Sequence, residues 1–345
     1  MNMSCKALTY KNSGSGLKHF DSGALIYKQK ISRLLACCLI AAAFTATTFT
    51  SLTGRNTVMA ADPVAKAAPA VKQVIEEDPV WPELKTELFE SRAINSENSL
   101  LTMEAPYRAH DAALVPIVIK ANQFKPGQYI KALTLVVDNN PVPVAAVFDL
   151  SPKLGPLHLE TRIRINQYSY VRAIAEMNDG SLFMVAKYVK AAGGCSAPAM
   201  KDMEARIAAI GRMKLRQFTA KPDMKSDEHS SGDMAKSDTA KQLQSTPAQR
   251  EIQLMVRHPN YSGMQLNQET GYYIPAHYVE KITVNIDGEQ LMKVDGAISL
   301  SEDPIIRFRF QAATEQPTVK LIVTDTKKQT FETEWKMKSP SELGS

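Results

Sequence analysis

One short stretch, residues 189–199 (VKAAGGCSAPA), carries the residue type best suited to covalent chemistry. It places the thiol of Cys195 directly after two glycines, Gly193 and Gly194, and before small residues. Glycine adopts φ angles of either sign, so this pair predicts a pivot for a projecting thiol. Free cysteines are often buried, but a core position normally lies within an apolar periodic run, which this stretch lacks. The sequence therefore predicts an exposed, functional thiol at Cys195.

The N-terminal region predicts export. Residues 34–49 form an apolar run rich in alanine and threonine behind a basic segment, and residues 58–60 (VMA) offer small residues for cleavage. This order is typical of a secretory signal peptide, here covering residues 1–61 with a long basic start. An uncleaved membrane anchor is the alternative, although the run is short for a spanning helix. We expect a periplasmic protein with no membrane segment after cleavage.

The expected signal peptide contains three of the four cysteines. Cys5, Cys37 and Cys38 lie within it, so cleavage leaves Cys195 as the single thiol. One thiol excludes a disulfide scaffold, and in an oxidising compartment it is expected to react with a partner's cysteine, a metal or a substrate.

The net charge of +5 does not indicate a polyanion partner. Residues 1–61 hold seven of the 41 Lys and Arg residues and one of the 36 Asp and Glu residues. The remainder, with 34 basic and 35 acidic residues, is close to neutral, so no nucleic-acid partner is expected.

Two regions of alternating, β-type sequence make up most of the mature chain. The expected strands are 114–120, 130–138, 144–150, 161–166, 170–176 and 181–190 in the first region, and 251–258, 279–287, 290–294, 305–312, 318–324 and 330–335 in the second. Short strands at this spacing, separated by turn signals such as NDG at 178–180, favour sandwiches over a parallel sheet.

The two regions also resemble each other. TLVVD (134–138) matches TVNID (283–287), and RIRI (162–165) matches RFRF (307–310). Alternation of arginine with an apolar residue predicts a strand that keeps its arginines, Arg164 among them, on a solvated face. We therefore expect an all-β protein with two domains of one sandwich class.

The connecting segments are expected to differ from the domains. A flexible start (62–80) precedes an amphipathic helix over 81–89. A second helix is expected from Pro198, with one apolar face that packs against a domain; its members are Met200, Met203, Ile207 and Ile210. Residues 219–249 are polar and aperiodic, which predicts a disordered linker. The resulting division is 1–61 signal peptide, 62–80 flexible segment, 81–198 first sandwich with the cysteine-bearing arm, 199–249 helix and linker, and 250–337 second sandwich.

No residue is predicted to be catalytic or to hold a cofactor or metal. The chain lacks a Ser/His/Asp arrangement, a phosphate-binding glycine loop and a His/Cys cluster with metal-site spacing. Met224, His229 and Met234 offer soft ligands for copper, but we expect such sparse ligands on a polar linker to be incidental. His258 and His277 lie beside turns that contain proline, where a structural role is expected. A thiol enzyme would need a histidine near Cys195 in space.

Four segments of the first region together resemble SoxY, the sulfur-carrying subunit of the bacterial thiosulfate-oxidising system: 138–148 (DNNPVPVAAVF), 161–164 (TRIR), 179–180 (DG) and 189–195 (VKAAGGC). The second region, with HP at 258–259, IPAH at 274–277 and FRF at 308–310, is similar to its partner SoxZ. The order and fusion resemble the SoxYZ-like carriers associated with quinoprotein dehydrogenases.

This resemblance implies two immunoglobulin-like sandwiches that pair within the chain. It also implies a sulfur intermediate attached to Cys195 on a swinging arm, with Gly193 and Gly194 as the hinge. In SoxY the arm ends the chain, whereas here it continues as Ser-Ala-Pro into a helix, which puts thiosulfate as the cargo in doubt.

The leading hypothesis is a periplasmic, non-enzymatic carrier that presents a sulfur-containing group to redox enzymes of a sulfur-oxidising or quinoprotein system. The alternative is an accessory binding module of a quinoprotein (methanol or alcohol) dehydrogenase, without covalent carriage. The identity of the cargo and the partner enzymes are not defined by the sequence.

Overall fold

The structure, a computed structural model, describes residues 79–96, 100–121, 124–198, 203–218 and 248–343. The expected signal peptide, nearly all of the 62–80 segment and most of the expected linker lie outside these ranges. The described residues within 77–84 and 91–345 form one compact unit, which contains every described strand. Within the described ranges, no helix has the length and apolar character needed to cross a membrane.

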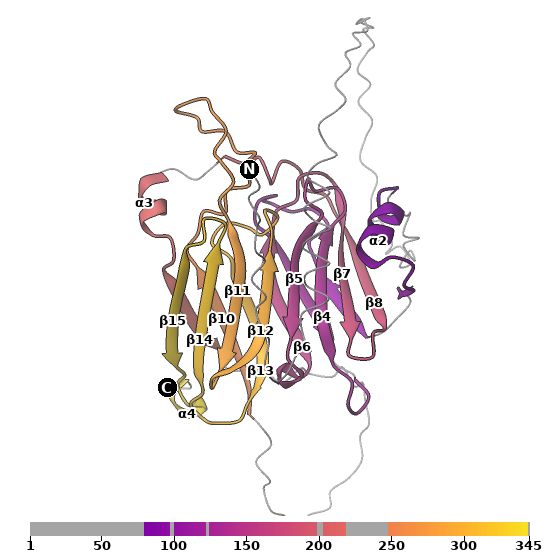
Figure 1. The fold of residues 1–345 in the computed structure, drawn as a ribbon, viewed down its shortest axis with the longest axis vertical. Coiled ribbons are helices and arrows are strands. Elements are labelled where there is room, and N and C mark those ends of the chain that lie inside the picture. Colours follow the sequence, from indigo (N-terminus) through magenta and orange to yellow (C-terminus); the bar gives the residue numbers. More distant parts are fainter. Residues whose placement is uncertain (1–78, 97–99, 122–123, 199–202, 219–247, 344–345) are drawn as a thin grey trace, which may run out of the picture. The chain divides into compact units, whose positions relative to one another are not determined.

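The fold is all-β, as expected, and consists of two sheets that each run through both sequence regions (Figure 1). The nine-stranded sheet has the order β1 (Ile94–Asn95), β8 (Leu182–Val189), β7 (Ser169–Met177), β4 (Ile130–Val137), β5 (Val144–Leu150), β12 (Glu289–Gly296), β11 (Val279–Ile286), β14 (Thr318–Asp325) and β15 (Thr330–Lys336). The six-stranded sheet has the order β2 (Leu101–Glu104), β3 (Val115–Ala121), β6 (Leu157–Ile163), β13 (Ile305–Ala312), β10 (Ala248–Val256) and β9 (Met213–Phe218).

The two regions join directly, strand to strand, which confirms the expected pairing within the chain. In the larger sheet β5 pairs antiparallel with β12, and in the smaller sheet β6 pairs antiparallel with β13. On either side of these junctions the strand order is mirrored, because β4 and β7 follow β5 as β11 and β14 follow β12. The matching TLVVD and TVNID segments lie on β4 and β11, so the internal resemblance reflects equivalent positions in two related sandwiches.

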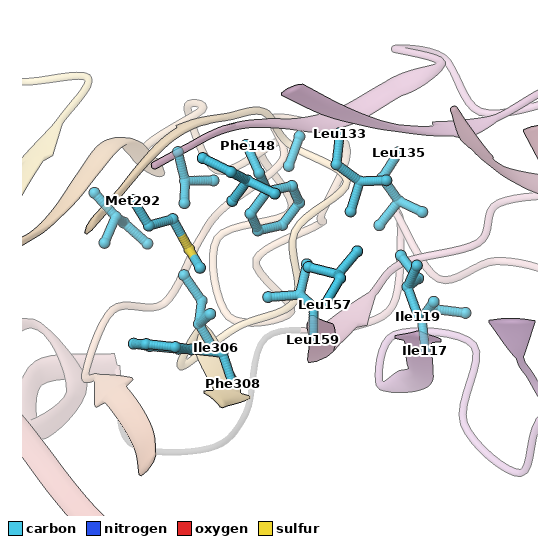
Figure 2. Packing of buried hydrophobic residues seen from close by; sticks show 14 of the residues in the cluster. Ile117, Ile119, Leu133, Leu135, Phe148, Leu157, Leu159, Met292, Ile306 and Phe308 are labelled. Atoms are coloured by element: carbon cyan, nitrogen blue, oxygen red, sulfur yellow. The ribbon is translucent and has the colours of Figure 1, made fainter. Parts of the chain in front are cut away.

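Alternating burial along the strands builds a single core between the sheets. β6 and β14 each alternate buried and partly exposed residues, as expected for strands with one face on a core. Figure 2 shows Phe148 and Leu159 of the first region close to Met292 and Phe308 of the second, and all four belong to one continuous buried cluster. Because neither region keeps a core of its own, we expect them to fold together.

Most expected strands are present within a few residues, and the helix Trp81–Phe89 (α2) is confirmed. The short edge strands β1, β2 and β9 were not predicted, and β9 occupies the position in the second region that β2 holds in the first. The second helix is present as α3, which covers Met203–Ala208, and residues 199–202, over which it was also expected to run, lie outside the described residues. Two further short helical turns, η1 (Pro152–Leu154) and α4 (Pro340–Leu343), complete the described elements.

Candidate functional site

The cysteine-bearing arm begins where β8 ends. Its backbone is held by a few hydrogen bonds to the loop after β6, from the amide of Gly193 to the carbonyl of Asn166 and from that of Gly194 to the carbonyl of Ile165, both at 2.9 Å. Gly193 has a φ angle of +79°, which favours glycine, and the following turn closes with a bond from the Ser196 amide to Gly193. The arm is therefore docked against the first sandwich in this conformation.

The thiol of Cys195 is fully buried, with 0% of the residue exposed, so the expectation of an exposed thiol was wrong. The reason lies at Gly194. A Cβ atom there would lie 2.1 Å from the carbonyl oxygen of Ala112, a distance at which atoms overlap. The second glycine thus permits close approach of two backbones, which carries Cys195 inward. Whether the glycine pair also serves as a hinge remains a prediction.

Burial changes the chemistry of the docked thiol. It raises the pKa of Cys195 to about 11, with the positive charge of Arg164 acting in the opposite direction. At neutral pH the docked sulfur is therefore protonated and a poor nucleophile. No histidine among the described residues hydrogen-bonds to it, so the Cys–His pair that a thiol enzyme would need is absent from this part of the chain.

Both sandwich domains hold the arm. Arg164, from the loop after β6, donates from Nη1 to the carbonyl of Gly194 at 3.1 Å and from Nη2 to the carbonyl of Asn260 at 3.4 Å. The hydroxyl of Ser262, from the second domain, donates to the carbonyl of Cys195 at 2.5 Å. The docked arm is therefore in contact with residues of both domains.

The sequence pattern placed Arg164 incorrectly. Alternation in RIRI predicted a solvated arginine, but β6 ends at Ile163 and Arg164 is only 1% exposed. Ser262 and Asn260 were not predicted at all. Their sequence context, a loop after the HP pair at 258–259, gives no signal of contact with Cys195, 67 positions before Ser262, or with Arg164, 96 positions before Asn260.

A second buried cluster of polar residues lies next to Asn260, in the loop that contributes Ser262 to the arm. The Nε2 atoms of His277 and His258 lie 2.8 Å and 3.7 Å from Oδ2 of Asp325. Two imidazoles and a carboxylate are a donor set suited to a transition metal. However, the amide of Asn260 donates to Nδ1 of His258 at 3.0 Å, which places the proton of the neutral ring on Nε2 and leaves that atom no lone pair for a metal.

This cluster instead connects structural elements, in keeping with the structural role expected for both histidines. It joins the loop between β10 and β11 to the end of β14, and the amide of Gln329 donates to the other oxygen of Asp325. Burial, together with the neighbouring His277, lowers the pKa of His258 to about 4 against the opposing effect of Asp325, so His258 is neutral near pH 7.

One cavity is lined by residues around α3 and from the second domain, and another adjoins the base of the arm. One of about 390 Å³ is mainly apolar, and three members of the predicted helix face, Met203, Ile207 and Ile210, line it opposite Ile274 and Phe331. The fourth, Met200, lies outside the described residues. The other cavity, of about 290 Å³, is polar and adjoins the base of the arm; it is lined by Arg108, Ala109, His110, Ala112, Tyr168, Lys190, Ala191 and Ala192. The possible copper ligands Met224, His229 and Met234 also lie outside the described residues.

Three solved structures that match the chain do so with low sequence identity and low TM-score. The sulfur carrier protein SoxY from Chlorobium limicola f thiosulfatophilum is 21% identical, with coverage of 32% of this chain and 91% of that one, and a TM-score of 0.28. A superoxide reductase (neelaredoxin) from Ignicoccus hospitalis is 14% identical, covering 26% and 78%, with a TM-score of 0.24. A beta-glycosidase from Bacteroides vulgatus is 9% identical, covering 69% and 24%, with a TM-score of 0.20. No protein with a curated description matches the chain.

Comparison with protein families is more informative. Residues 85–195 match the family of the sulfur oxidation protein SoxY, and the match ends at Cys195. Residues 240–336 match the family of the sulphur oxidation protein SoxZ. The two matches follow one another in the order expected from the motifs and correspond to the two paired sandwiches. The chain therefore belongs to the SoxY and SoxZ families, as a fused SoxYZ-like protein.

Proposed function

We propose that this chain is a periplasmic carrier that holds a sulfur-containing intermediate covalently on Cys195 and presents it to partner enzymes. The observation that carries the proposal is the position of Cys195. It is the one free cysteine of the described residues, it is the residue at which the SoxY match ends, and it lies on a segment without strand structure. Membership of a sulfur-oxidation family makes a sulfur compound the cargo class that fits best.

Carriage requires the arm to leave its docked position, because the thiol is buried there. The arm is suited to local release. From Ala192 to Ser196, only Gly194 and Cys195 are buried, whereas Ala192, Gly193 and Ser196 are exposed. A segment held by a few hydrogen bonds opens at a lower free-energy cost than the sandwich as a whole. Once released, the thiol regains an ordinary cysteine pKa of about 8.5 and a larger thiolate fraction.

The chemistry of loading defines the class of partner. Joining the thiol to thiosulfate forms one S–S bond and releases one proton and two electrons, with the sulfonate end left intact. The electrons must pass to a redox enzyme, since the described residues contain no disulfide that could accept them. The arm therefore has to reach the active site of an electron-accepting enzyme, while both of its ends remain attached to the carrier.

The test is intact-mass analysis of the chain isolated from its native cells, followed by peptide mapping. We expect a sulfur-containing mass addition on the peptide that carries Cys195, removed by a thiol reductant and absent from the Cys195→Ser variant. An unmodified Cys195 in cells that are actively oxidising a reduced sulfur compound would refute carriage. Binding of a partner enzyme retained by Cys195→Ser would separate docking from carriage.

A further inference from the structure

Arg164 is a buried cation whose direct partners are all uncharged. It is 1% exposed, and its guanidinium donates to the carbonyl oxygens of Gly194 and Asn260. Its third nitrogen, Nε, is buried and has no hydrogen-bond partner. Burial lowers the pKa of Arg164, which reflects the cost of holding a charge in this position. Buried charges in proteins are normally paired with a counter-charge.

The acidic groups that face Arg164 are engaged elsewhere. Glu302 acts on it from a distance but forms an ion pair with Arg206 at 3.3 Å. Asp111 also acts from a distance, and its Oδ1 accepts the amide of Ala113 at 2.7 Å. Within the described ranges, no carboxylate lies within ion-pair distance of Arg164, so its charge has no direct counter-ion. Two further titratable groups act on it: the thiol of Cys195, and the guanidinium of Arg206, whose like charge lowers the pKa of Arg164.

We propose that the docked position of the arm is a binding site for an anionic group carried on Cys195, with Arg164 as its counter-cation. The inference rests on the proposed carrier function and adds to it a specific residue, Arg164, that holds the charged end of the cargo when the arm is docked. Such a group supplies the counter-charge that the unloaded arm lacks. A charge-assisted contact stabilises the docked arm more than a neutral adduct of the same length does.

Two chemical adducts of Cys195 test this, because they share the same disulfide attachment and differ in the charge of the terminal group. Attack of the thiolate on tetrathionate forms Cys–S–S–SO₃⁻ and releases thiosulfate. Attack on methyl methanethiosulfonate forms Cys–S–S–CH₃ and releases methanesulfinate. Both are prepared in a full chain in which Cys5, Cys37 and Cys38 are replaced by serine, with modification confirmed by intact mass.

Hydrogen exchange at the amides of Gly193 and Gly194 reports docking, because these amides bond to Asn166 and Ile165 only in the docked arm. In the wild-type chain we expect exchange to be about tenfold slower for the anionic adduct than for the neutral one, as one charge-assisted hydrogen bond would give. The difference should disappear in Arg164→Gln and be partly retained in Arg164→Lys.

Arg162→Gln is the matched control, since Arg162 lies two residues away and donates to the carbonyl of Asp303 instead of to the arm. It should leave the difference between the adducts unchanged. Equal exchange for the two adducts in the wild type would overturn the proposal, even where Arg164 variants do not fold. A difference that persists in Arg164→Gln would overturn the role of Arg164. Because the adducts are made chemically, neither result depends on whether the chain carries sulfur in cells.

Discussion

The hydroxyl of Ser262 donates a hydrogen bond to the carbonyl oxygen of Cys195 at 2.5 Å, and this bond crosses from the SoxZ-like domain to the end of the SoxY-like domain. The second domain therefore takes part in holding the thiol and is more than a partner for folding. Fusion of the two domains fixes their stoichiometry, so every arm has its docking partner in the same molecule.

Replacing Ser262 with alanine should loosen the arm without disturbing the sandwiches. The change removes the hydroxyl that donates to the Cys195 carbonyl and accepts from the amide of Met264. The bond to the arm is worth about 1 kcal/mol. We expect the labelling rate of Cys195 by a thiol reagent to rise about fivefold at constant pH. An unchanged rate would show that the bond does not limit release of the arm.

Replacing Gly194 with alanine should abolish docking. The new Cβ atom would lie 2.1 Å from a backbone oxygen of Ala112, and no side-chain rotation relieves that overlap. We expect Cys195 to react at nearly the rate of a cysteine in an unfolded peptide, whereas thermal unfolding of the sandwiches changes little.

Gly193→Ala is the control for this experiment. Its Cβ atom would meet no atom within 4 Å, so the cost is confined to left-handed backbone strain of about 1–2 kcal/mol. Its effect on labelling should therefore be smaller than that of Gly194→Ala. If the two variants behave alike, the arm is not held by close backbone approach at Gly194.

The strand pattern predicted most of the fold, because a strand with one buried face alternates apolar and polar residues along its own sequence. β5 and β13 were predicted with the bounds that the structure has. The short edge strands were missed, since two to six residues carry too little alternation to stand out from loops. The pairing of β5 with β12 was also not predicted, because the strand pattern does not show which strand of one region pairs with which strand of the other.

The exposure of Cys195 was predicted wrongly, and its role as the attachment site stays a prediction. Gly193–Cys195 indicated a mobile thiol from local sequence alone, whereas burial of Cys195 depends on Ala112, Arg164 and Ser262. A glycine needed for freedom and a glycine needed for close approach look identical in sequence. Only the three-dimensional contacts distinguish them.

The shared core predicts that both domains unfold in one transition. Phe148 of β5 faces Val294 of β12 across the junction and is buried in the common cluster. Phe148→Ala should cost about 3–5 kcal/mol of unfolding free energy. The two tryptophans, Trp81 before the first sandwich strands and Trp335 on β15, allow each side to be followed in single-tryptophan variants. Transitions at different denaturant concentrations would contradict a common core.

Acid should weaken the protein through His258. Its pKa is about 4 in the folded chain and about 6.5 when unfolded, so the unfolded state binds more protons between these values. Stability is therefore full above about pH 6.5 and falls by up to about 3 kcal/mol as the pH drops to about 4. Denaturant unfolding at pH 7 and pH 4.5 should show a smaller loss in His258→Asn than in the wild type. Equal losses would show that His258 is not the responsible group.

Carriage of a group on Cys195 requires this residue to leave its docked position while the sandwiches remain folded. Labelling of the Cys195 thiol at increasing urea concentration, compared with global unfolding of the same chain, measures this local release. We expect the free energy of exposure to be well below that of unfolding and nearly independent of urea at low concentration, as for local opening. If the thiol becomes reactive only with the urea dependence and free energy of global unfolding, the arm does not move independently and the carrier account is contradicted.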